Sequence, residues 1–323
     1  MQIDACAADG VRPHWTPRRW QMRAIAVTAL GGPEVLHVVD LPDPVAGPGQ
    51  VLVRVRAACV QPADAAARTG RIPGGPVPPP FVPGWDFAGD VVAVGAADGR
   101  FHVGDRVVGL VPWHLTRGAP GAYAQLLAAD VDWLTELPTA LDYATAATLP
   151  LNAQTASQAV RLLAGDGPLL VVGASGGVGG FAVQLAHQAG RRVLAVANDH
   201  DQDWVREIGA DEVVARSAGP AAVGQVPAVF DAVPVGEAAA NATKDGGVLV
   251  TTRLAEPIDP ARGVRRQVVL IRPDQRTLRD LVTAAAVGRL RTRVAATIPF
   301  ERAAEAHRIM ATGGLPGKVV LTF

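Results

Sequence analysis

The amino-acid sequence predicts an α/β protein with two domains, a mostly-β domain and a doubly wound parallel sheet. The chain has 323 residues, which is long for one hydrophobic core and suits two. From Met22 to about residue 135, short β-type runs are separated by Gly and Pro. After Leu141 the pattern changes to strands that alternate with helices, which is typical of a parallel sheet.

The mostly-β part begins at Met22 with the strand pattern MRAIAVTAL, and VLHVVDL follows as the second strand of a pair. Further strand patterns come next, joined by Gly- and Pro-containing turns: QVLVRVRAA, DVVAVGA, DRVVGLV and AYAQLLAA. The Pro-rich residues 71–84 are too stiff for a helix and predict an extended crossing on the surface. Residues 1–21 show no periodicity, so we expect a poorly ordered N-terminal extension.

The second part begins with an Ala-rich helical stretch around residues 141–163, which Pro150 interrupts. Strand patterns then alternate with helical ones: PLLVVG, RRVLAVA, DEVVA, AVFDAV, GGVLVTT and QVVLIRP. From Arg293 onwards the tail has the pattern strand, helix, strand, and it could rejoin the first domain.

The composition argues against several classes of function. The chain carries 30 basic and 30 acidic side chains, only two of them lysines (Lys244 and Lys318), and it has no basic run, so we expect no nucleic-acid partner. The apolar runs are far shorter than the roughly 20 residues of a membrane helix, so we expect no membrane span. The two cysteines, Cys6 and Cys59, cannot build a disulfide framework or a four-thiolate zinc site, which favours a cytoplasmic location.

The stretch LLVVGASGGVGG at residues 169–180 predicts a dinucleotide site. A buried strand pattern precedes the glycines and a helical pattern follows them, so the glycines lie at a strand-to-helix turn. Such a turn lets the backbone approach a pyrophosphate, and the helix N-terminus supplies free N–H groups and partial positive charge. The spacing is Ala174-x-Gly176-x-x-Gly179, with Ala in place of the first Gly of the strict motif.

The end of the next strand favours NADPH over NADH. An NAD site usually has an acid at this strand tip, where it holds the ribose hydroxyls and would repel a 2′-phosphate. Here the tip carries Ala197, and Asp199 and Asp201 come only after it. Arg216 and His200 are candidate partners for the 2′-phosphate, although each could also be a solvated surface residue.

Several motifs in order are similar to those of one enzyme family. They are GGPEVL (31–36), AACVQPADAAARTG (57–70), PGWDFAGDVVAVG (83–95), VGDRVVGL (103–110), GAYAQ (121–125), LPLNAQTA (149–156), VVGASGGVGG (171–180), EIGADEVV (207–214) and AAEAHRIMATGGLPGKVVL (303–321). With them the chain resembles the medium-chain dehydrogenase/reductase superfamily, in its zinc-independent quinone oxidoreductase branch. The resemblance implies a GroES-like catalytic domain over residues 22–142 and 290–323, and a Rossmann cofactor domain over 143–289.

The departures from the zinc-dependent members of that family predict a reaction without a metal. Those members hold a catalytic zinc at three positions that correspond here to Gln61, Trp85 and Pro150, none of which is an ordinary zinc ligand. The family's structural four-cysteine lobe is missing too. Asp86 follows Trp85, where a carboxylate is more typically bonded to a backbone turn than to a metal.

The resemblance also implies roles for individual residues. Gln61 takes the position of an Asn in quinone oxidoreductases, so its amide could donate to a substrate carbonyl, and Thr155 matches a residue near the nicotinamide. Trp85 could line an apolar slot or belong to the core, and His114 could donate a proton or lie in solvent. The predicted catalytic residues are Gln61, Asp64, Trp85 and His114. The predicted cofactor-binding residues are Thr155, Ala174, Ser175, Gly176, Gly177, Val178, Gly179, Asn198, Arg216 and Thr251.

These observations together predict an NADPH-dependent reductase that transfers a hydride to a quinone or an α,β-unsaturated carbonyl. An enoyl reductase of a biosynthetic, polyketide-like pathway is the enzymatic alternative. A structural or regulatory protein that binds NADPH without catalysis is the alternative from another class. Residues 267–273, rich in β-branched side chains, predict an edge strand, and relatives pair this edge, so we expect a homodimer.

Overall fold

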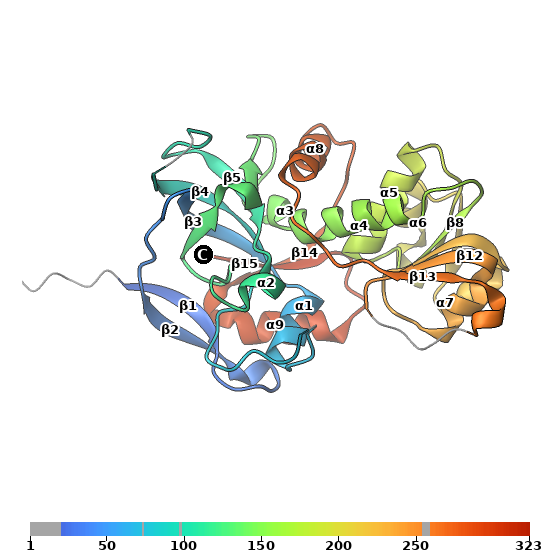
Figure 1. Ribbon diagram of the computed structural model, residues 1–323, viewed down its shortest axis with the longest axis horizontal. Helices are drawn as coiled ribbons and strands as arrows, with labels where there is room; N and C mark the ends of the chain where they lie inside the picture. The colour runs from blue at the N-terminus through green and yellow to red at the C-terminus, as the bar shows by residue number, and fades with distance from the viewer. Residues whose placement is uncertain (1–20, 73, 97–98, 254–258) are drawn as a thin grey trace, which may run out of the picture.

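A computed structural model describes residues 21–72, 74–96, 99–253 and 259–323. Of the predicted N-terminal extension, residues 1–20 lie outside this described part. Figure 1 shows two lobes, a mostly-β lobe and a lobe built on a parallel sheet, joined side by side. This arrangement confirms the predicted fold class. Among the helices of the described residues, none is both long and apolar enough to span a bilayer.

The six-stranded sheet is parallel throughout, in the order β10-β9-β8-β11-β12-β13. Its central strands are continuous apolar runs because helices cover both faces of the sheet. Alternate residues of β8 point to opposite faces: Leu169 and Val171 to one core cluster, Leu170 and Val172 to another. The strands are β8 (Leu169–Val172), β9 (Val193–Ala197), β10 (Glu212–Ala215), β11 (Val226–Asp231), β12 (Thr243–Thr251) and β13 (Arg265–Val268).

The helices of this lobe divide between the two faces. Helices α4 and α5 pack against each other on the face of Leu169, and α7 packs on β11 and β12 at the other face. The break at Pro150 is confirmed, because Pro150 is the first residue of α4 and α3 ends just before it. The bounds are α3 (Tyr143–Ala147), α4 (Pro150–Leu162), α5 (Gly177–Gln188), α6 (Gln202–Glu207), α7 (Glu237–Ala242) and α8 (Gln275–Ala286).

The other lobe is a seven-stranded sheet with the order β14-β15-β3-β4-β5-β7, in which β6 also pairs with β3. The tail of the chain rejoins the first lobe, as the sequence suggested, because β15 pairs antiparallel with β3. The strands are β3 (Gln50–Cys59), β4 (Asp86–Val94), β5 (Arg106–Leu110), β6 (Leu126–Asp130), β7 (Leu134–Glu136), β14 (Val294–Pro299) and β15 (Lys318–Thr322).

Smaller elements complete this lobe. The predicted strand pair at its beginning is confirmed as the antiparallel hairpin of β1 (Gln21–Val27) and β2 (Leu36–Pro42). The helices are α1 (Pro62–Arg68), α2 (Trp113–Thr116) and α9 (Ala303–Thr312). Short 3-10 turns of the described residues lie at Pro33–Val35, Val131–Trp133, Asp199–Asp201, Pro220–Val223, Pro260–Arg262 and Phe300–Arg302.

The edge strand differs from the prediction. The sequence predicted a strand over residues 267–273, whereas β13 covers Arg265–Val268. The last hydrogen bond of this segment to β12 runs from the N–H of Val269 to the Thr251 carbonyl oxygen, and beyond it the chain diverges from β12. From there α4 holds it, because the Gln158 side chain accepts from the N–H of Arg272 at 3.2 Å and donates to its carbonyl at 2.7 Å.

Candidate functional site

The glycine turn after β8 is shaped by close backbone contacts. Gly173 has a φ of +84°, and a Cβ there would lie 2.7 Å from the side chain of Val233. A Cβ on Gly179 would clash with the Gly173 carbonyl oxygen, so glycine lets α5 begin this close to the strand. Ala174, in place of the first motif glycine, is buried and donates its N–H to Val196. The first N–H groups of α5, including that of Val178, therefore lie at the turn without intrahelical partners and are available to an anion.

Two orphan polar atoms lie at the ends of neighbouring strands. The Thr251 hydroxyl, at the end of β12, and one carboxylate oxygen of Asp231, at the end of β11, are buried without a hydrogen-bond partner among the described residues. Burial raises the pKa of Asp231. Polar groups at the carboxyl edge of a parallel sheet are where a nucleotide binds in doubly wound folds. Together with the glycine turn, these atoms fit a dinucleotide.

The tip of β9 brings three predicted cofactor residues to the same edge. The N–H of Asn198 donates to the Ser175 hydroxyl at 2.9 Å, which ties the β9 tip to the glycine turn. The N–H of Arg216 donates to the Ala197 carbonyl at 2.7 Å, and the Arg216 side chain is exposed. His200 is exposed as well, and its Nε2 lies 3.1 Å from the carbonyl oxygen of Gly314.

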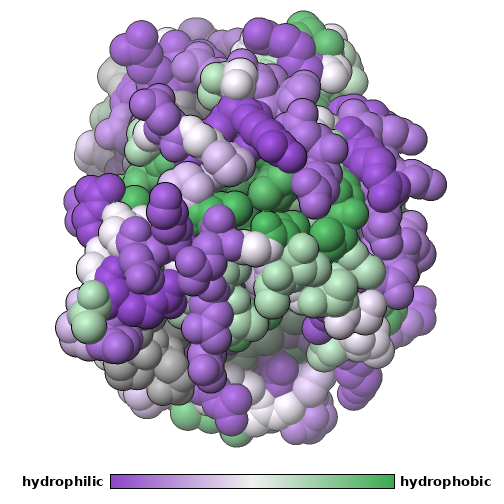
Figure 2. Space-filling view, turned by 90° about the vertical axis from the view of Figure 1, so that its right-hand side faces the viewer, coloured by the Kyte–Doolittle hydropathy of each residue, from purple (hydrophilic) through white to green (hydrophobic). Residues whose placement is uncertain are grey.

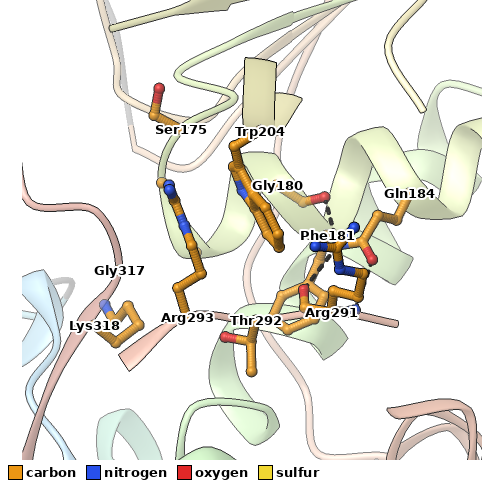
Figure 3. Close-up of a pocket in the computed structure, with 12 residues that line it drawn as sticks. Ser175, Gly180, Phe181, Gln184, Trp204, Arg291, Thr292, Arg293, Gly317 and Lys318 are labelled. Carbon is orange, nitrogen blue, oxygen red and sulfur yellow. Dashed lines mark hydrogen bonds between the residues drawn. The ribbon is translucent and has the colours of Figure 1, made fainter. Parts of the chain in front are cut away.

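Lys318 connects the glycine turn to the predicted catalytic residues, and the sequence reasoning missed it. Its Nζ donates to Gln61 Oε1 at 2.8 Å, and its Cδ would lie 3.1 Å from a Cβ on Gly177. In Figure 3 its side chain lies beside Gly317, at the edge of a pocket that Ser175 also lines. An ammonium this close to the start of α5 is suited to a pyrophosphate. A usable signal was present, because Lys318 is one of only two lysines in the chain.

Gln61 is fully engaged at both ends of its side-chain amide. Nε2 donates to Asp86 Oδ2 at 2.6 Å and approaches the Cys59 sulfur at 3.4 Å, and Oε1 accepts from Lys318. The residue is 1% exposed. The prediction that Gln61 donates to a substrate carbonyl stays a prediction, and it requires the amide to exchange Asp86 for the substrate.

Asp64 holds the loops that present Gln61. Its carboxylate accepts from the N–H of Gln61 at 2.9 Å, from the N–H of Gly84 at 3.0 Å and from the Tyr123 hydroxyl at 3.2 Å. The first of these bonds is half of a capping box at the start of α1. Burial raises the pKa of Asp64 to about 7, against the lowering effect of these hydrogen bonds. Asp64 therefore positions the loop backbone instead of facing an open cleft.

Asp86 connects the three positions that hold zinc in the metal-dependent relatives. It follows Trp85, accepts from the Gln61 amide, and accepts from the N–H of Leu151, next to Pro150, at 2.6 Å. Burial raises its pKa to about 7. The structure therefore brings the neighbourhoods of Gln61, Trp85 and Pro150 together around one carboxylate. Within the described ranges, no group of three or more His, Cys, Asp or Glu side chains could hold a metal ion.

Trp85 and His114 form a stacked pair near this carboxylate. Their ring centroids are 5.3 Å apart and their planes differ by 13°. Trp85 Nε1 and His114 Nδ1 are buried and have no hydrogen-bond partner in the described part of the chain. Burial, with a smaller contribution from Arg272, lowers the pKa of His114. A neutral imidazole is therefore the form that this pair presents at neutral pH.

Thr155, the remaining predicted residue, lies on α4 and is 7% exposed. In the same helix, Asn152 donates to the Thr148 carbonyl at 2.8 Å, and its Oδ1 would lie 2.8 Å from a Cβ on Gly177. The first turns of α4 therefore pack directly against the glycine turn. Most of the predicted residues gather in two places, the turn at the start of α5 and the cluster around Asp86, and Lys318 joins them. Thr251 and Arg216 lie apart from both, at the ends of strands on either side of the turn.

Comparison with known proteins agrees with this architecture. Residues 47–139 match the family model "Alcohol dehydrogenase GroES-like domain", and residues 208–321 match "Zinc-binding dehydrogenase". The chain is 32% identical over 315 residues to the NADPH-dependent alkenal/one oxidoreductase of Arabidopsis thaliana, a chloroplastic protein, covering 93% of this chain and 79% of that one. It is 31% identical to the quinone oxidoreductase of Sus scrofa over 93% of this chain and 97% of that one.

A solved structure is similar along nearly the whole chain. The quinone oxidoreductase from Coxiella burnetii superposes with a TM-score of 0.84 at 26% identity, over 94% of this chain and all of that one. The fold and site define an NAD(P)-dependent oxidoreductase of two lobes, with the cofactor turn beside the joint between them. The chain belongs to the medium-chain dehydrogenase/reductase superfamily, and its relatives include quinone oxidoreductases.

Proposed function

We propose that this protein is a zinc-independent, NADPH-dependent reductase that transfers a hydride to a quinone or an α,β-unsaturated carbonyl. The observation that carries this proposal is the hydrogen-bonded set of buried Gln61, buried Asp86 and half-buried Lys318, which lies at the positions that hold zinc in the metal-dependent relatives and adjoins the glycine turn. The bound nicotinamide would supply the hydride. The names of the relatives, quinone oxidoreductase and alkenal/one oxidoreductase, support this class of acceptor.

The chain's own residues have three tasks in this proposal. The N–H groups at the start of α5 and the Lys318 ammonium hold the pyrophosphate, and Thr251 offers its unpaired hydroxyl to the cofactor. Trp85 closes an apolar wall against a flat acceptor and excludes water. The Lys318 ammonium, bonded to Gln61, lies where it can also favour negative charge that develops on the acceptor oxygen.

The preference for NADPH is supported by the tip of β9. Ala197 is 1% exposed and offers no carboxylate to the ribose, and Arg216 adds an exposed guanidinium at the same edge. An anionic 2′-phosphate is favoured where the strand tip itself carries no acid.

The test is a panel of quinones, enones and enoyl thioesters, with consumption of NADPH as the measured quantity. We expect turnover of quinones or enones, together with less than stoichiometric zinc by elemental analysis. Turnover of enoyl thioesters alone would favour the biosynthetic enoyl reductase, and tight NADPH binding without any turnover would favour a non-catalytic role. Stoichiometric zinc would contradict the proposal.

We also propose a homodimer that forms through the edge of the six-stranded sheet. Figure 2 shows apolar side chains gathered across the middle of the end of the molecule that carries β12 and β13. Leu270, just after β13, is 62% exposed, and Val235, after β11, is 41% exposed. An edge strand with exposed apolar neighbours is suited to pairing across a twofold axis. Sedimentation at micromolar concentration is the measurement, and a monomer would contradict this part.

A further inference from the structure

An acidic side chain lies near the place where the adenosine ribose would bind. Asp201 follows the glycine turn at about the spacing, roughly 20 residues, at which dinucleotide-binding folds place the acid that holds the ribose 2′-hydroxyl. An accessible carboxylate at this position favours NADH and repels the 2′-phosphate of NADPH. The side chain of Asp201, however, is 1% exposed. Its surroundings therefore decide how the site treats the cofactor.

Arg293 neutralises this carboxylate. Its Nη2 lies 2.8 Å from Asp201 Oδ1, and the Arg293 side chain is 24% exposed. The other polar neighbours of Asp201 are more distant: His200 Nε2 at 3.6 Å and Asn198 Nδ2 at 3.5 Å. A buried carboxylate needs a close cationic partner, and the distances show that Arg293 is this partner.

The guanidinium of Arg293 also lies beside the glycine turn. It belongs to the pocket that the start of α5 and Lys318 line, and Figure 3 shows it beside the Trp204 ring and directed towards Ser175. The main chain of Arg293 is held at the start of β15, because the N–H of Lys318 donates to the Arg293 carbonyl at 2.8 Å. Ser175 in turn accepts from the N–H of Asn198 at the β9 tip.

We propose that Arg293 is a specificity-determining residue for the cofactor. By pairing with Asp201 it withdraws from the ribose a buried acid of the turn Asp199–Asp201, which follows β9, and it keeps a guanidinium near the expected place of the 2′-phosphate. NADPH is thereby accepted although an acid, Asp201, follows the β9 tip. This inference rests on the proposed function, and specifically on its preference for NADPH.

Arg291 provides a matched control in the same pocket. Its guanidinium carbon lies 4.4 Å from the centroid of the Trp204 ring, against 4.6 Å for Arg293, so both arginines stack on one indole. The charge of Arg291 is paired with Glu207, which is 59% exposed, at 3.3 Å and not with Asp201. Loss of Arg291 therefore removes the same charge and the same type of stacking without releasing the buried carboxylate.

The experiment compares R293Q, R291Q and the double variant D201N/R293Q with the wild type. Cofactor fluorescence gives the Kd for NADPH and for NADH, and calorimetry with 2′,5′-ADP and ADP isolates the contribution of the 2′-phosphate. We expect R293Q to weaken NADPH about tenfold, which corresponds to about 1.4 kcal/mol, and NADH less than about twofold. R291Q should change the Kd values for NADPH and for NADH by less than about twofold. The double variant should recover most of the lost NADPH affinity, because it removes the released charge.

Three results would overturn the inference, and they can be told apart. If R293Q weakens NADPH and NADH equally, Arg293 has only a structural role. If R293Q leaves both Kd values unchanged, the Arg293–Asp201 pair does not decide specificity although the proposed cofactor stands. If the wild type itself binds NADH as tightly as NADPH, the NADPH part of the proposed function fails, and this inference with it. Retention of NADH binding in R293Q shows that the variant is folded.

Discussion

The glycine turn after β8 and the cluster around Asp86 are built in opposite ways. The turn uses the backbone of one short stretch, residues 173–179, and glycine is required because main-chain atoms approach closely. The cluster uses side chains of segments distant in the chain, such as Gln61 and Lys318, which are 257 residues apart. The turn therefore depends on the absence of a Cβ at a few positions, whereas the cluster depends on the polar group that each side chain supplies. Different substitutions should break each of them.

The largest effect is expected from Gly179→Ala. The new Cβ would clash with the Gly173 carbonyl oxygen, so α5 must move away from the turn. Its first N–H groups would then no longer be in place to bind the pyrophosphate. We expect NADPH binding to weaken by at least ~100-fold in fluorescence titrations. Gly180→Ala is the matched control, since its Cβ would lie 3.4 Å from the Ala174 carbonyl oxygen, an ordinary contact. Equal Kd values for the two variants would show that close approach is not what the turn requires.

A smaller loss is expected from Lys318→Met, which tests whether one cation serves both regions. The variant removes the ammonium beside the start of α5 and the donor to Gln61. We expect the Kd of NADPH to rise roughly 10-fold to 100-fold, and the turnover number to fall as well. Lys244→Met, at the other lysine of the chain, which is exposed on β12, should change neither. A change in turnover without any change in Kd would separate Lys318 from the cofactor.

Asn198→Asp should shift the cofactor preference about tenfold towards NADH. The substitution keeps the backbone bond to Ser175 and adds a carboxylate at the β9 tip, where the 2′-phosphate would meet it. This position is better suited than Ala197, whose burial would make a carboxylate destabilising as well. The ratio of NADPH to NADH Kd values is the measurement, with Asn241→Asp on the exposed side of α7 as control. An unchanged ratio would mean that the ribose lies elsewhere.

The smallest effect concerns stability and pH. The pKa of Asp86, raised to about 7 by burial, lies above the value of about 3.9 for an exposed Asp, so the folded state holds a proton that the unfolded state has lost. This stabilisation is complete below about pH 4 and is lost as the pH rises towards 7. The Asn side chain of Asp86→Asn cannot ionise, so this variant does not lose the stabilisation. As the pH rises from 4 to 7, the melting temperature of the variant minus that of the wild type should increase by a few degrees.

The control for the pH experiment is Asp203→Asn, which removes an exposed carboxylate. A melting-temperature difference between Asp86→Asn and the wild type that stays constant from pH 4 to pH 7 would contradict the raised pKa.

Much of the fold and the cofactor turn could be predicted from the sequence, because contiguous residue patterns determine both. Apolar runs such as Leu169–Val172 identify buried strands, and the glycine spacing identifies the turn. The Asp201–Arg293 and Gln61–Lys318 pairs were not accessible, since nothing local marks residues that meet only after folding. The end of the edge strand was missed for a related reason, because the side chain of Gln158, in a helix distant in the sequence, forms hydrogen bonds with the backbone N–H and carbonyl of Arg272. The domain limits and the cytoplasmic location stay predictions.

The return of β15 to the seven-stranded sheet has a consequence for biosynthesis. Residues Ala57–Cys59 at the end of β3 pair with β15, which the ribosome makes only after all six strands of the other sheet. Until then the β3 edge lacks this neighbour, and an open edge invites contact with other nascent chains. The loop that carries Gln61 follows this edge directly, so the candidate site around Asp86 is one of the last parts of the molecule to reach its folded structure.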